Sequence, residues 1–83
     1  MQLAKYVKFR EEKFGGVLFE TRSEKVFTLN SAAAAIVREL EAGCDVREIA
    51  ARLEKLFDAS GGTVEREVAE FIADLRKKGL LEG

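Results

Sequence analysis

The predicted fold depends on one stretch, Phe14-Gly-Gly-Val-Leu-Phe-Glu-Thr-Arg-Ser-Glu-Lys-Val-Phe-Thr-Leu-Asn30. Residues 17–19 and 26–29 are short runs of β-branched, aromatic and aliphatic side chains, which favour β-strands. The polar residues 21–24 between them are typical of a hairpin connection. Asn30 and Ser31 then offer short side-chain oxygens that can cap the first turn of a helix. We therefore expect two antiparallel strands that lead directly into a helix.

The strand expected over Lys25–Leu29 is the last one before three helices. Because no later strand is predicted to pair with it, we expect this strand to form an edge of the sheet. An edge strand presents backbone N–H and C=O groups that an added peptide strand can satisfy.

An additional strand is predicted over Lys5–Arg10, where Val7 and Phe9 alternate with charged residues. Gly15 and Gly16 are expected to form a turn or bulge before the second strand. A phosphate-binding glycine loop is excluded, because such a loop needs a helix directly after it and here a strand follows.

After the predicted strands, the spacing of apolar residues predicts three helices. The first is predicted over residues 31–42 with Gly43 at its left-handed C-cap, and Asp45 and Glu48 have the spacing of a capping box that opens the second. Turn residues 58–62 separate the second helix from a third, which we expect to be capped by Thr63 and to end at Gly79. The expected buried positions are Ala33, Ile36, Val37 and Leu40 in the first helix, Ile49, Ala50, Leu53, Leu56 and Phe57 in the second, and Val64, Val68, Phe71, Ile72 and Leu75 in the third. Leu80 and Leu81 are expected to fold back on the last turn.

The composition limits the possible functions. Eighty-three residues are expected to form one domain over residues 1–83, and the net charge of −1 argues against a nucleic-acid partner. The chain has no histidine and one cysteine, Cys44, so we expect no metal site, no cofactor and no catalytic activity. Neither a signal peptide nor a membrane span is predicted, and the lone cysteine fits a reducing cytoplasm.

The expected fold class is therefore α+β, with a three-stranded antiparallel β-meander followed by three helices. In this order of elements, the chain resembles the PqqD-like family, whose members are also called RiPP recognition elements. The matching elements are Phe14-Gly-Gly16 before a strand, Leu29-Asn30 at the start of a helix, Leu40-Glu-Ala-Gly43 at its end, Ile49-Ala50 with Leu53, and Leu75 with Gly79-Leu-Leu81.

The resemblance implies a winged-helix-like domain that holds the leader segment of a precursor peptide for a modifying enzyme. In this family the leader adds as a strand to the third strand and lies beside the third helix. The Phe-Gly-Gly element is more similar to the members that serve radical S-adenosylmethionine maturases. The partners implied here are thus a precursor leader peptide and such a maturase.

The predicted peptide-binding residues come from the edge strand and from one flank of the third helix. At 100° per residue, Ala69 and Ile72 would form the floor of a pocket that Arg76 frames, whereas the opposite flank carries only charged residues. An alternative is that Ile72 only widens the core stripe. The full predicted set is Lys25, Val26, Phe27, Thr28, Leu29, Glu65, Ala69, Ile72 and Arg76.

Two other functions share this inventory of elements. A winged-helix DNA-binding domain also has three helices and a hairpin. However, the third helix, which would contact the DNA, has few basic residues in its first turns and carries four acidic residues, Glu65, Glu67, Glu70 and Asp74. Its charge therefore argues against DNA binding. The other alternative is a general protein-interaction or dimerisation module.

Overall fold

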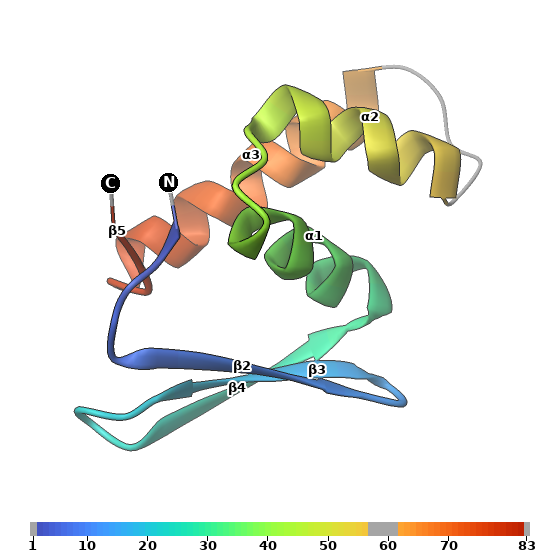
Figure 1. Cartoon of the computed structure of the whole chain (residues 1–83). Helices are drawn as coiled ribbons and strands as arrows, with labels where there is room; N and C mark the ends of the chain where they lie inside the picture. Colours follow the sequence, from blue (N-terminus) through green and yellow to red (C-terminus); the bar gives the residue numbers. More distant parts are fainter. Residues whose placement is uncertain (1, 57–61, 83) are drawn as a thin grey trace.

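The computed structural model describes residues 2–56 and 62–82. Its elements are, in chain order, β1 (Gln2–Leu3), β2 (Val7–Glu12), β3 (Gly15–Glu20), β4 (Lys25–Asn30), α1 (Ser31–Glu41), α2 (Val46–Leu56), α3 (Gly62–Lys77) and β5 (Leu81–Glu82). Strands β2, β3 and β4 form an antiparallel sheet in that order, and α1 lies over one of its faces (Figure 1). The predicted α+β order of a three-stranded meander and three helices is confirmed.

Two additional strands join the ends of the described chain. β1 and β5 pair antiparallel, with Leu3 opposite Leu81, and the Ala4 N–H donates a 2.9 Å hydrogen bond to the Leu80 carbonyl. The Leu80 N–H donates a 3.0 Å hydrogen bond to the Leu75 carbonyl, so the segment folds back on the last turn of α3 as predicted, and Leu81 also pairs with β1. These two strands were not predicted from the sequence, because two residues are too few to show an alternating pattern.

The predicted helix ends are largely confirmed. The Asn30 side chain accepts a 2.8 Å hydrogen bond from the Ala33 N–H, and α1 ends before Gly43, which has a φ of +90°. Asp45 and Glu48 exchange two hydrogen bonds of 2.9 and 3.1 Å between side chain and backbone, so the capping box is present.

Other expectations about local structure are wrong. Gly15 and Gly16 do not form the turn: they lie inside β3, and the turn falls on residues 13 and 14. β2 begins at Val7 rather than Lys5, and α3 begins at Gly62, so Thr63 lies within its first turn. Residues 57–61, which include Phe57 and most of the predicted turn, lie outside the described residues.

The close packing around Gly16 shows why β3 needs a glycine at this position. A Cβ at this position would come 2.7 Å from the Phe9 ring and 3.3 Å from the Ala34 Cβ. The missing side chain therefore lets α1 pack directly on β3.

The core forms between the sheet and the helices. Leu18 of β3, Leu40 of α1 and Ile49 of α2 are fully buried within it. Most of the predicted core positions are buried or partly buried. The prediction that Leu56 is buried is wrong, because 62% of its surface is exposed. It is the last residue of α2, and the buried residues of this helix end one turn earlier at Leu53.

Candidate functional site

The edge strand β4 is the first part of the candidate site. It pairs with β3 on one side, and no described strand pairs with its other side, so the predicted edge position is confirmed. The side chains of β4 alternate: Phe27 and Leu29 pack with the core, whereas Val26 and Thr28 are exposed. An added peptide strand would continue these two faces, with alternate side chains on the core side of the sheet and on its outer side.

The other sheet edge, β2, differs in its charge. Its sequence, Val-Lys-Phe-Arg-Glu-Glu, has four charged residues, whereas Lys25 is the only charged residue of β4. Charged side chains protect an edge strand against pairing with further strands. The β4 edge is therefore the more accessible of the two edges for an added strand.

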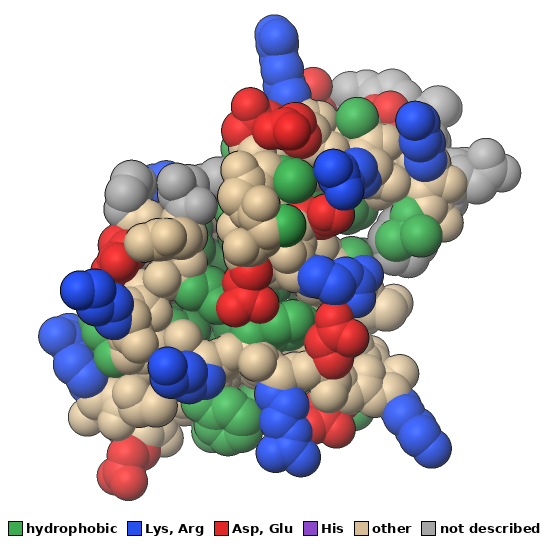
Figure 2. All heavy atoms as spheres, in the orientation of Figure 1, with side chains coloured by type: hydrophobic (Ala, Val, Ile, Leu, Met, Phe, Trp, Pro, Cys, Tyr) green, Lys and Arg blue, Asp and Glu red, His purple; other side chains and the backbone are tan. Residues whose placement is uncertain are grey.

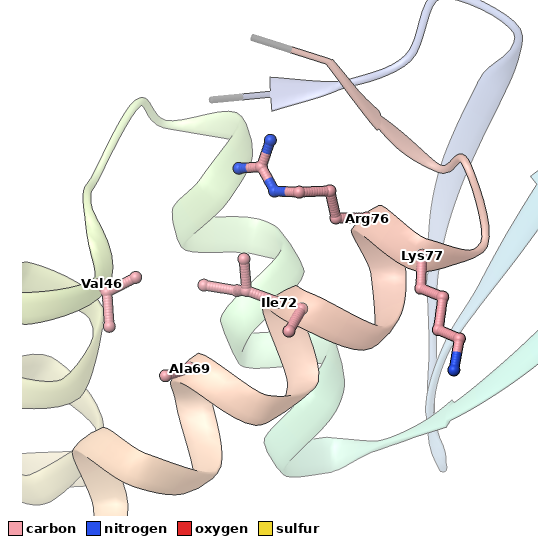
Figure 3. Close-up of a pocket in the computed structure, with 6 residues that line it drawn as sticks. Val46, Ala69, Ile72, Arg76 and Lys77 are labelled. Atoms are coloured by element: carbon pink, nitrogen blue, oxygen red, sulfur yellow. The ribbon is translucent and has the colours of Figure 1, made fainter.

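The second part of the candidate site is a groove on α3 with a volume of about 480 Å³. It contains Ala69, Ile72 and Arg76, which the sequence analysis placed on one flank, and we call it the α3 groove. Its remaining lining residues are Val46, Ala73 and Lys77. In Figure 3, Val46 at the start of α2 faces Ile72 across the groove, and Lys77 points away from Val46. Ile72 both lines the groove and belongs to the buried core, so it does more than widen the core stripe.

The structure does not bring all predicted site residues into one pocket. The α3 groove is completed by α2 rather than by β4, and Glu65 does not line it. Lys25 and Val26 line a separate pocket of about 290 Å³ beside the hairpin turn. The predicted residues thus fall on two surfaces, the β4 edge and the α3 groove.

Three groove residues were missed in the sequence analysis. Ala73 and Lys77 follow Ala69 by four and eight residues on the same helix flank, so the helical spacing itself could have identified them. Val46 belongs to another helix, and no local pattern in the sequence indicates that it faces α3.

The turn between β3 and β4 is held by one carboxylate. Glu20 accepts hydrogen bonds from the Arg22 N–H at 2.8 Å, from the Ser23 N–H at 3.0 Å and from the Ser23 hydroxyl. The hydrogen bond from the Ser23 side chain, together with these backbone donors and the Arg22 charge, lowers the pKa of Glu20 below its ordinary value. The ionised carboxylate therefore stabilises the turn next to the candidate edge.

This lowered pKa predicts how stability depends on pH. Because the folded-state pKa lies below the unfolded-state value, the Glu20 contribution is fully present above about pH 4.5 and is lost as the pH falls through the folded-state pKa. We expect Glu20→Gln to lower the melting temperature at pH 7 and to reduce the further loss on acidification. Thermal unfolding at pH 7, 4 and 3 measures both effects. Glu24→Gln removes an exposed carboxylate from the same turn and serves as the control; equal melting curves for the two variants would contradict the prediction.

The charges of the surface are mixed. Figure 2 shows Lys and Arg side chains interspersed with Asp and Glu over the visible face, without an extended basic surface. Across the described ranges, the structure contains no cluster of three or more His, Cys, Asp or Glu side chains that could hold a metal ion. None of the helices in this part of the chain is both long and apolar enough to span a bilayer. Cys44 is buried within the core cluster.

Comparisons with known proteins agree with this geometry. A family model described as "Coenzyme PQQ synthesis protein D (PqqD)" matches residues 15–81. The structure is similar to "TbiB1 in Complex with the TbiA(beta) Leader Peptide", with a TM-score of 0.91 and 28% identity over 100% of this chain and 96% of that chain. It is also similar to "Lasso peptide synthetase B1 complexed with the leader peptide", with a TM-score of 0.85 and 25% identity over 99% and 96% of the two chains. No curated protein sequence matches.

Proposed function

Because the chain belongs to the PqqD family, we propose that it binds the leader segment of a ribosomally made precursor peptide as a strand along β4. The prediction that it is not an enzyme is confirmed by this membership, because the domains of this family bind peptides and are not catalytic. The observation that carries the proposal is the β4 edge, which has a single charged residue, Lys25.

The two solved relatives support this proposal. Each was determined with a leader peptide, and each aligns with almost the whole of this chain. Backbone hydrogen bonds along β4 would supply affinity that does not depend on the leader sequence, whereas side-chain contacts next to the strand would supply specificity.

The α3 groove is our proposed second contact with the leader. Ala69 and Ile72 offer an apolar surface, and Arg76 offers a guanidinium group that a leader carboxylate can meet. Since β4 does not line this groove, the leader would use a different segment there from the one that pairs with the strand.

By binding the leader, the chain would present the precursor peptide to a modifying enzyme. Two classes of enzyme are candidates for this partner. The predicted radical S-adenosylmethionine maturase stays a prediction based on the Phe-Gly-Gly resemblance. Both glycines of that element have steric roles in this fold, so the element does not by itself identify the enzyme. The lasso peptide relative favours a lasso-type maturation enzyme as the second candidate.

The buried lone cysteine is consistent with the predicted cytoplasmic location.

An NMR titration tests the proposed binding mode. With the TbiA(beta) leader as the probe peptide, we expect the largest amide shifts at Val26–Leu29 and smaller shifts at Ala69 and Ala73. Affinity should depend only weakly on salt, because backbone pairing rather than charge dominates the contact. The proposal is contradicted if the largest shifts fall within α2. It is also contradicted if neither this probe nor a library of random peptides shifts any amide.

A further inference from the structure

The face of the sheet that points away from the helices carries an exposed apolar surface. Leu18 and Phe27 pack with the core, so their neighbours Phe19 and Val26 lie on the opposite face. Figure 1 shows α1 on one side of the sheet and no described element on the other. Val26 is 57% exposed and is one of the few large apolar side chains of the described residues that face solvent.

The strand register places these side chains in one row. Lys8 of β2 lies opposite Phe19 of β3, which in turn lies opposite Val26 of β4. The row is charged at the β2 edge and apolar at the β4 edge. Val26 and Phe19 also line the pocket of about 290 Å³ beside the hairpin turn, which we call the outer-face pocket.

We infer that the outer-face pocket is a specificity subsite that takes an apolar side chain of the added leader strand. This inference rests on the proposed strand addition at β4. A strand paired with β4 extends the Lys8–Phe19–Val26 row by one position, and the side chain at that position points to the outer face. Directly opposite side chains in neighbouring strands contact each other, and aromatic and β-branched pairs stabilise such rows.

The subsite explains an unusual feature of this edge. Outward-facing positions on an exposed edge strand are often charged, because charge prevents unwanted pairing. Here Val26 keeps an apolar side chain in solvent next to Phe19. The charged residues Glu20, Glu24 and Lys25 also line the pocket, but they lie outside the Lys8–Phe19–Val26 row. An apolar leader residue would remove both apolar side chains from water.

A double-mutant cycle tests the subsite. The full chain is used to select binders from a displayed library of random 12-residue peptides, and each apolar position of the best binder is replaced by serine. We expect one position whose replacement weakens binding to the wild-type chain about fivefold, the upper range for a cross-strand pair. The same replacement should change binding to Val26→Lys less than twofold, because the partner side chain is already absent.

The matched control is Thr28→Lys, which adds the same charge to the same face of β4, two residues further along. This variant should keep the fivefold effect, and both variants should keep the wild-type melting temperature because both sites are exposed. Binders that shift the β4 amides but show no coupling with Val26 would overturn the subsite alone. A library that yields no binder to the wild-type chain would overturn the proposed function and the subsite together.

Discussion

Replacing Gly15 with alanine is expected to lower the free energy of unfolding by about 3 kcal/mol, since overpacking and backbone strain each cost 1 to 3 kcal/mol. An added Cβ would overlap the Leu29 carbonyl oxygen and would lie 2.6 Å from that of Asn30. Gly15 also has a φ of +145°, a conformation that residues with a side chain rarely adopt. Since the obstructing atoms are backbone, the overlap is relieved only if the backbones of β3 and β4 move apart.

Urea denaturation measures this loss, and Gly43→Ala provides the control. Gly43 also has a positive φ, of +90°, but a Cβ there would meet no atom within 4 Å. Its replacement should cost only about 1 kcal/mol for the backbone conformation alone. Equal losses in the two variants would show that the close approach of β3 to β4 is not what requires a glycine at position 15.

Gly15 also connects the fold to the candidate site. It lies opposite Asn30, whose side chain caps α1, so one close approach fixes both the end of β4 and the start of the helix. The folded fraction of Gly15→Ala should therefore have a displaced β4 edge, which is the proposed surface for strand addition.

Features determined by neighbouring residues were predictable from the sequence. The hairpin, the Asn30 cap, the capping box of Asp45 and Glu48 and the left-handed Gly43 each depend on residues within a few positions of one another. The edge position of β4 followed from the order of the elements, because no strand was predicted after it.

Features that depend on tertiary contacts were not predictable. The two glycines looked like a turn, because their need for close packing on Leu29, Phe9 and Ala34 is visible only in the folded chain. The pairing of β1 with β5 joins residues almost a chain length apart. Similarly, the helical spacing of α3 identified one flank correctly as apolar but could not show that Val46 of α2, rather than β4, completes the α3 groove.

Ala69→Glu is expected to weaken leader binding at least about tenfold, which corresponds to about 1.4 kcal/mol. Ala69 lies on the wall of the α3 groove, and a glutamate there would fill space and place a charge next to the apolar surface of Ile72. Ala69 is itself exposed, so the free energy of unfolding should change little. Isothermal titration calorimetry, with a leader or selected peptide that binds the wild-type chain, measures the effect on binding. Thermal unfolding measures the effect on stability separately.

Glu67→Lys on the opposite flank of α3 is the matched control. That flank is already charged, and Asp74 and Lys78 form an ion pair on it, so it offers no apolar surface to a leader side chain. We expect binding to this variant to stay within about twofold of wild type, the range of small surface-charge effects. If Glu67→Lys weakens binding and Ala69→Glu does not, the leader contacts the charged flank of α3. If neither variant affects binding while the β4 amides still shift, strand addition alone holds the leader, and the α3 groove is not part of the peptide site.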